Sequence, residues 1–360
     1  DTILAPGASL RLRKNIAFDD ELQWSVRPAV SVDYRYEKFS PENTAPGAKV
    51  GRESDRHSVS FGGELSTLLG PIGTELIGSG RWERVWSTLE NPGSVTGTVI
   101  TPTDQKADDE FTWRVGLVQR SIPSTELTFN YAASVRFPSL YELFGNTGNV
   151  VGNPRLAAEE GTTMDAGIVH SADWLPDGNT WNLQLHIFQT KMTNLIQFAQ
   201  NSQGVARAEN VDSVELLGIE IGTYADVLSH LRVRGSMSWM ETENTGEIKA
   251  RKGKQLARRP RWQTFARLEG YHDFGRKSVG EVGLWVDVEH ITGNFQDNAN
   301  LVELPERTLM GVGAYAEFWD SQLRVDVTVR NLTDSRVQDF SGFPLPGVSA
   351  LASLRYVPKL

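Results

Sequence analysis

Apolar and polar residues alternate with a period of two along most of this sequence, and this pattern constrains the fold more than any other feature. Segment 321–332 shows it well, with Leu323, Val325, Val327 and Val329 separated by Arg324, Asp326 and Thr328. Segments 57–66, 229–240 and 281–290 repeat it. A helix would scatter the charges around its axis, whereas a strand places them on one face. The pattern therefore predicts an all-β protein.

Fifteen segments of the chain fit this strand pattern, and several exceed the five or six residues usual in globular proteins. A strand of about 9–11 residues crosses a lipid bilayer, so segments of this length are compatible with a transmembrane barrel. The predicted strands are 9–24, 28–39, 56–68, 73–89, 109–120, 124–137, 161–171, 179–199, 204–225, 229–243, 260–274, 278–291, 306–318, 322–332 and 347–357.

The connections between these segments alternate between short and long. The predicted long connections are 40–55, 90–108, 138–160, 194–212, 244–259, 292–305 and 333–346. Outer-membrane barrels have tight periplasmic turns and long extracellular loops. We therefore predict an antiparallel transmembrane β-barrel with an apolar outer face and a polar lumen.

Composition supports a barrel of this kind and excludes other classes of protein. Only 39% of the residues are hydrophobic and 22% are charged, with a formal net charge of −9 and no cysteine. The acidic balance argues against a general nucleic-acid binder. The absence of cysteine excludes disulfide scaffolds and thiolate metal sites. A closed barrel satisfies its backbone hydrogen bonds within the membrane, which lets so polar a chain reside there.

Strand parity adds a prediction about completeness. If the last strand ends in the periplasm, counting back through fifteen strands places residues 1–8 outside the cell. Single-chain bacterial barrels have an even number of strands. We therefore expect residues 1–360 to form the C-terminal portion of a larger barrel.

Four short motifs resemble those of the TonB-dependent outer-membrane receptors. They are the segment from Val135 to Phe144, the stretch Gly152-Asn-Pro-Arg-Leu156 with Glu159 and Glu160, the strand from Leu217 to Gly222, and Asn331-Leu-Thr-Asp334 with the segment from Gly342 to Gly347. The residues that carry the resemblance are Arg136, Pro138, Glu142, Asn153, Pro154, Glu220, Asn331, Leu332, Asp334, Pro346 and Gly347.

The resemblance implies a barrel of 22 strands with a plugged lumen, a known class of outer-membrane transporter. It implies uptake of a bulky nutrient (an iron chelate, cobalamin or a glycan) without enzymatic chemistry or a cofactor. The expected partners are a plug-bearing N-terminal polypeptide or segment that supplies about seven more strands, a TonB-type energy-transducing complex acting through the plug, and lipopolysaccharide with outer-membrane lipid. The alternative is a plugless barrel that acts as a passive pore or as a platform for surface lipoproteins.

Candidate ligand-binding residues lie in the predicted long loops. Loop 138–160 contains Tyr141, Phe144, Asn146 and Asn149, and loop 292–305 contains Phe295 and Gln296. A basic run that includes Arg258 and Arg259 lies between them, where it attracts an anionic ligand or lipopolysaccharide, or is simply a solvated loop. Aromatic and amide side chains can line a ligand cleft or pack the loops together.

Metal and catalytic motifs are missing from the sequence. The six histidines are scattered without metal-ligand spacing, and neither a nucleophile elbow nor a phosphate-binding loop is present. The tryptophans Trp181, Trp239, Trp262 and Trp319 fit an aromatic girdle at the membrane interfaces better than a cofactor site.

Overall fold

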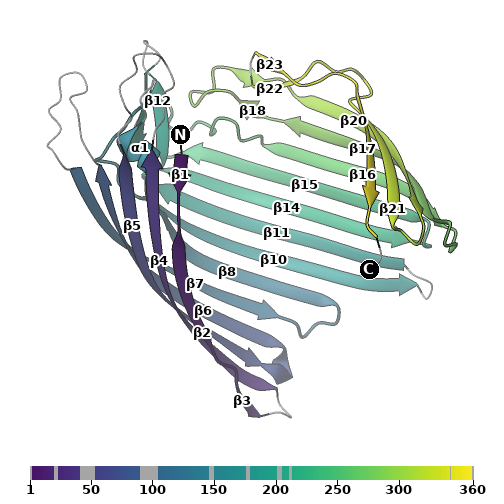
Figure 1. Ribbon diagram of the computed structural model, residues 1–360, viewed down its shortest axis with the longest axis horizontal. Coiled ribbons are helices and arrows are strands. Elements are labelled where there is room, and N and C mark those ends of the chain that lie inside the picture. Colours follow the sequence, from purple (N-terminus) through teal and green to yellow (C-terminus); the bar gives the residue numbers. More distant parts are fainter. Residues whose placement is uncertain are drawn as a thin grey trace.

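The computed structural model describes residues 2–19, 23–40, 53–89, 104–145, 150–175, 179–200, 205–210, 213–340 and 342–358. Within these ranges no helix is both long and apolar enough to cross a membrane. One large antiparallel sheet dominates the molecule and curves into a trough (Figure 1). Candidate residues Asn146 and Asn149 lie outside the described ranges.

The large sheet contains the fifteen strands that the alternation predicts. Its first strand is interrupted and consists of β1 (Thr2–Leu4), β2 (Gly7–Arg13) and β3 (Ile16–Asp19), which all pair with β4. The others are β4 (Trp24–Ser40), β5 (Ser54–Leu69), β6 (Thr74–Leu89), β7 (Asp104–Gln119), β8 (Thr125–Arg136), β10 (Glu159–Leu175), β11 (Asn179–Thr193), β14 (Val214–Val227), β15 (Leu231–Asn244), β16 (Trp262–Asp273), β17 (Val279–Thr292), β20 (Arg307–Phe318), β21 (Leu323–Arg330) and β24 (Ser349–Tyr356).

Each strand pairs with its neighbour in this order, and the sheet does not close. Among the described residues, the interrupted first strand pairs only with β4, and β24 pairs only with β21. The two edges lie apart in Figure 1, with the first strand and β24 on opposite sides of the trough. Both edges therefore leave backbone hydrogen-bonding groups without a strand partner.

The two faces of the sheet differ in the way the alternation predicts. The outer face carries exposed apolar side chains such as Val32, Ile187, Leu268 and Val286. Residues of the opposite parity, such as Asp33, Arg267 and Asp287, line the inner face. Trp239 and Trp262 lie directly opposite each other on the outer face of β15 and β16, as expected for an interface girdle.

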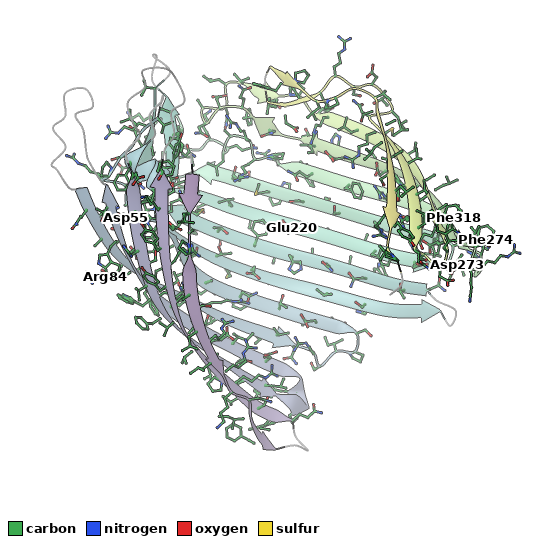
Figure 2. All side chains as sticks on the ribbon, viewed as in Figure 1. Asp55, Arg84, Glu220, Asp273, Phe274 and Phe318 are labelled. Carbon is green, nitrogen blue, oxygen red and sulfur yellow. The ribbon has the colours of Figure 1, made fainter. Side chains whose placement is uncertain are left out.

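Short and long connections alternate, as the sequence predicts. Tight turns such as 70–73, 228–230 and 319–322 lie at one end of the sheet, and the strand ends that the long connections join lie at the other. Figure 2 labels Asp273, Phe274 and Phe318 at the tight-turn end, and Asp55 at the opposite end. By the topology of outer-membrane barrels the long-loop end is extracellular.

Four predicted strand boundaries need correction. The first strand occupies 2–19 instead of 9–24, and the predicted strand 109–120 begins at Asp104. The predicted strands 179–199 and 204–225 each merge two elements. Their loop-proximal parts form β12 (Ile196–Gln200) and β13 (Ala206–Asn210), which join β9 (Val150–Val151) in a separate sheet. Asn194 adopts a left-handed conformation with φ of 57°, which ends β11 before β12 begins.

Candidate functional site

A short helix at the long-loop end, α1 (Leu140–Phe144), begins the candidate site. Ser139 caps it, because the backbone N–H of Glu142 donates to the Ser139 hydroxyl and the N–H of Ser139 donates to the Glu142 carboxylate. This reciprocal arrangement is a capping box, which satisfies two helix N–H groups. It explains why five residues hold a helical turn directly after a strand.

Arg136, the last residue of β8, ties α1 to β10. Its guanidinium donates to Glu159 from Nε at 2.7 Å and from Nη2 at 2.5 Å, and to Glu142 from Nη1 at 3.0 Å. Glu159 also accepts from the backbone N–H of Ile196 at 2.8 Å, at the start of β12. Two carboxylates and one planar guanidinium therefore join β8, α1, β10 and β12.

A small apolar cluster fills the space beneath α1. Leu143, Leu156, Ile196 and Ala208 are buried there, and Phe144 packs against them. Asn153 connects α1 to β13. Its side-chain amide donates to the carbonyl of Ala208, and its backbone N–H donates to the carbonyl of Glu142. We call α1, β9, β12, β13 and the segment 152–158 the apical unit.

The wall of the sheet holds the apical unit from below. Arg56 on β5 is buried and donates to the carbonyl of Pro138 and to the hydroxyl of Ser87. Lys106 on β7 donates to the carbonyl of Leu156. The motif residues Arg136, Pro138, Glu142 and Asn153 therefore fix the architecture of this end of the sheet.

The aromatic candidates of loop 138–160 face different surroundings. Tyr141 packs between Phe39 of β4 at 6.1 Å and Phe198 of β12 at 5.7 Å, measured between ring centroids. Phe198 is 45% exposed, so this aromatic group reaches the surface. Phe144 instead packs against the buried cluster.

Residues 245–261 form the loop that contains the basic run, and we call it the basic loop. It packs against loop 293–306 beside the apical unit. The N–H of Arg258 donates to the carbonyl of Phe295 at 2.7 Å. The Gln255 amide donates to the carbonyls of Arg259 and Gly293, and the N–H of Gln296 donates to the carbonyl of Val302. The side chains of Arg258 and Arg259 are exposed. The structure therefore places Arg258, Arg259, Phe295 and Gln296 in one pair of loops.

A side-chain hydrogen bond links these loops to the apical unit. The Asn298 amide donates to the Gln197 side-chain carbonyl on β12 at 2.7 Å. Within loop 293–306, the Asp297 carboxylate accepts from the backbone N–H groups of Ala299, Leu301 and Val302. The hydrogen bond from Val302 is the largest cause that lowers the pKa of Asp297 from its ordinary value.

The motif at the end of the chain is also architectural. The Asn331 amide donates to the carbonyls of Ser335 and Pro346, and Asp334 accepts from the N–H of Val348. A Cβ on Gly347 would lie 2.4 Å from the Asp334 carboxylate, so any other residue there would displace that carboxylate. Leu332 is exposed, and its N–H donates to the carbonyl of Met310.

Glu220 lies apart from the other motif residues, about halfway along the sheet (Figure 2). It faces the lumen between His186 and Ser238 in the strand register and lines a cavity of about 520 Å³. Among the described residues, no group of three or more acidic or histidine side chains could hold a metal ion.

Two parts of the site were not predicted from the sequence. The capping box Ser139-Leu-Tyr-Glu142 has a recognisable sequence pattern that would have predicted α1. Arg56 carries no such signal, because its partner Pro138 is distant in the sequence and the contact depends on the fold.

Comparison with known families identifies the class of protein. The sequence matches the family described as TonB dependent receptor-like, beta-barrel, over residues 7–332. The chain therefore belongs to the β-barrel part of the TonB-dependent receptor family, which resides in the bacterial outer membrane. No curated protein matches the sequence.

Solved structures with the same fold include two transporters and a hemophore receptor. The copper transporter OprC is 15% identical with a TM-score of 0.75, and the ferric citrate transporter FecA is 14% identical with a TM-score of 0.74. The hemophore receptor HasR of Serratia marcescens, solved with its hemophore HasA and heme, is 16% identical with a TM-score of 0.72. Each alignment covers 98% of this chain but only 56%, 54% and 59% of the respective structure. The chain thus spans a little over half the length of these proteins.

Proposed function

We propose that this chain forms the C-terminal portion of the barrel of a TonB-dependent receptor that takes up a bulky nutrient, such as an iron chelate, cobalamin or a glycan. A plug-bearing N-terminal polypeptide or segment completes the barrel with about seven further strands. A TonB-type energy-transducing complex acts on that plug and so drives uptake of the ligand. Lipid and lipopolysaccharide surround the outer face.

The open sheet is the observation that carries this proposal. The first strand and β24 both lack a second strand partner among the described residues. An unpaired backbone group within hydrocarbon costs several kcal/mol, so a membrane barrel needs every edge paired. Further strands between the two edges satisfy this requirement and agree with the chain spanning only part of its structural relatives.

The exposed residues at the long-loop end support a role in ligand capture. Tyr141 belongs to an aromatic group that reaches the surface, and Arg258 and Arg259 present exposed guanidiniums on the adjacent loops. We propose that Tyr141, Phe144, Arg258, Arg259, Phe295 and Gln296 belong to the ligand-binding end, together with Asn146 and Asn149. Aromatic and guanidinium groups at the same end of the sheet suit a ligand that combines ring systems with anionic groups.

An uptake assay in cells tests the proposal. Cells that carry the complete receptor are supplied with a panel of labelled ferric chelates, cobalamin and oligosaccharides, with and without an uncoupler of the proton-motive force. We expect accumulation of one ligand class that stops with the uncoupler. Uptake unaffected by the uncoupler, together with steady ion conductance in planar bilayers, would contradict the proposal and favour a passive pore.

A further inference from the structure

A cavity of about 290 Å³ lies on the lumen face of β15, β16, β17, β20 and β21 and shares no lining residue with the apical unit. Five arginines line it, together with two carboxylates and two aromatic side chains. The arginines are Arg232, Arg234, Arg267, Arg324 and Arg330. The positive charge of these five guanidiniums has to be balanced by nearby carboxylates or by a bound anion.

Three of these arginines are held by carboxylates of the same wall. Arg232 pairs with Asp226, Glu269 and Glu281 at 3.3, 3.0 and 2.7 Å. Arg324 pairs with Glu317 and Asp326 at 2.9 and 3.0 Å, and Arg267 pairs with Asp287 at 2.5 Å. Every carboxylate in this set therefore already has a guanidinium partner.

Arg234 and Arg330 are different, because neither forms an ion pair with a carboxylate in the described part of the chain. Both side chains are exposed to the lumen. The nearest aromatic contact of Arg234 is the ring of Tyr224, 5.7 Å from its guanidinium carbon. These two charges remain available to an external group.

The strand register places the available arginines in one row across the wall. Arg234 lies directly opposite Arg267, which lies opposite Asp287. Asp287 lies opposite Gly311, and Gly311 lies opposite Arg330. Like charges directly opposite each other destabilise a sheet, so the pairing of Arg234 with Arg267 does not contribute to folding.

The middle of this row is rigidly organised. The Arg267 guanidinium lies 3.9 Å from the centre of the Trp285 ring and donates from Nε and Nη2 to one oxygen of Asp287. Trp285 lies over Gly313, where a Cβ would come within 2.3 Å of the indole. A stacked guanidinium keeps its plane fixed while its remaining N–H groups can donate to an oxyanion.

We propose that the row formed by Arg234, Arg267 and Arg330 binds a carboxylate or phosphate group of the transported ligand as it passes along this wall. The inference rests on the proposed function, because it names the charge class of the ligand. The cavity is at the small end of the range for ligand pockets, so it holds one oxyanion group of a larger ligand. Binding here relieves the repulsion between Arg234 and Arg267.

Anion binding to the purified receptor tests this assignment. The intact outer-membrane protein that contains this chain is titrated in detergent with citrate and with inorganic phosphate, at low and high salt. The variants Arg234→Gln and Arg330→Gln remove the two unpaired charges. Arg11→Gln is the matched control, since Arg11 also faces the lumen and is exposed, but on β2.

We expect each of the two variants to weaken binding by about tenfold, the order expected for the loss of one charge-assisted hydrogen bond. The Arg11→Gln variant should bind as the unaltered protein does. Equal binding by all variants would overturn the assignment, as would failure of the unaltered protein to bind either anion. A crystal structure with a carboxylate of another polypeptide segment seated in the row would also overturn it. The measurement needs no energy source, so it can succeed even if uptake proves independent of the proton-motive force.

Discussion

Arg136 and Glu159 form a two-point ion pair that joins the end of β8 to the start of β10, with Nε–Oε2 and Nη2–Oε1 separations of 2.7 and 2.5 Å. The Glu159 side chain is only 6% exposed, so this carboxylate depends on its partner. Because Glu142 shares the same guanidinium, the pair also fixes the position of α1. This one guanidinium therefore joins β8, α1 and β10.

The variant Arg136→Ala should weaken the attachment of the apical unit to β8 and β10. Leaving a buried carboxylate without its partner costs about 3–5 kcal/mol, and the lower end applies here because the Arg136 side chain is 45% exposed to solvent while that of Glu159 is buried. We expect the free energy of local unfolding to fall by roughly 3 kcal/mol, measured by native-state hydrogen exchange at Leu143 and Ile196. Arg35→Ala is the control, since Arg35 and Glu37 form an exposed pair at 3.5 Å worth at most about 1 kcal/mol. Similar losses in both variants would contradict the assigned role.

A side chain at position 313 should lower the stability of the sheet. A Cβ there would lie 2.3 Å from the Trp285 indole, which would have to leave its place beneath Arg267. Overpacking of this kind costs about 1–3 kcal/mol, so the Gly313→Ala variant should melt at a lower temperature. Gly222→Ala is the matched change on the lumen face, where the nearest atom to a Cβ is 3.9 Å away. An unchanged melting temperature for Gly313→Ala would show that Trp285 is not held in this way.

The fold of loop 293–306 should depend on pH through Asp297. Its folded-state pKa is lowered chiefly by the backbone N–H of Val302, so the carboxylate contributes stability above the unfolded pKa of about 3.9. That stability disappears as the pH falls through the folded pKa. We expect protection of the Leu301 and Val302 amides, corrected for intrinsic exchange rates, to be constant between about pH 7 and 5 and lost below about pH 4. The Asp297→Ala variant should lack this protection at every pH.

The outward direction of Val286 can be tested by its tolerance of charge. Val286 is 46% exposed on the outer face near the middle of β17. Arginine on the lipid face at this depth costs about 2–4 kcal/mol. Val286→Arg should therefore lower the free energy of unfolding measured in lipid vesicles, whereas Ser236→Arg on the lumen face should change it far less. Equal effects at both positions would contradict the assignment of the two faces.

The sequence predicts the strands well because their signal is local. Alternation in segments such as 229–240 reports which residues face lipid, and it needs no knowledge of distant contacts. The apical unit is different, because β12 and β13 also alternate and were merged with β11 and β14. The left-handed turn at Asn194 that separates β11 from β12 leaves no mark in the alternation.

The candidate site was predicted only in part, for a related reason. The motif around Arg136 and Glu142 resembles a known family, but its ion pairs with Glu159 join segments 23 residues apart and become visible only in the fold. The row of Arg234, Arg267 and Arg330 arises from strand register. The alternation assigns Arg234 and Arg330 to the polar face of their strands, but it does not show that the three arginines share one row across the wall.

The edges of the sheet allow the most direct test of the account, because the chain contains no cysteine and engineered pairs form disulfides without competition. Antiparallel neighbours have Cα atoms about 4.5–5.5 Å apart, within disulfide reach. Val325→Cys with Leu354→Cys spans the paired strands β21 and β24 and is the positive control. Leu10→Cys with Leu354→Cys would join the two open edges. After mild oxidation in outer membranes, we predict a disulfide in the control pair and none between the edges within one chain. A disulfide between Leu10→Cys and Leu354→Cys that forms as efficiently as the control would show that the fifteen strands close on themselves, and would contradict the account.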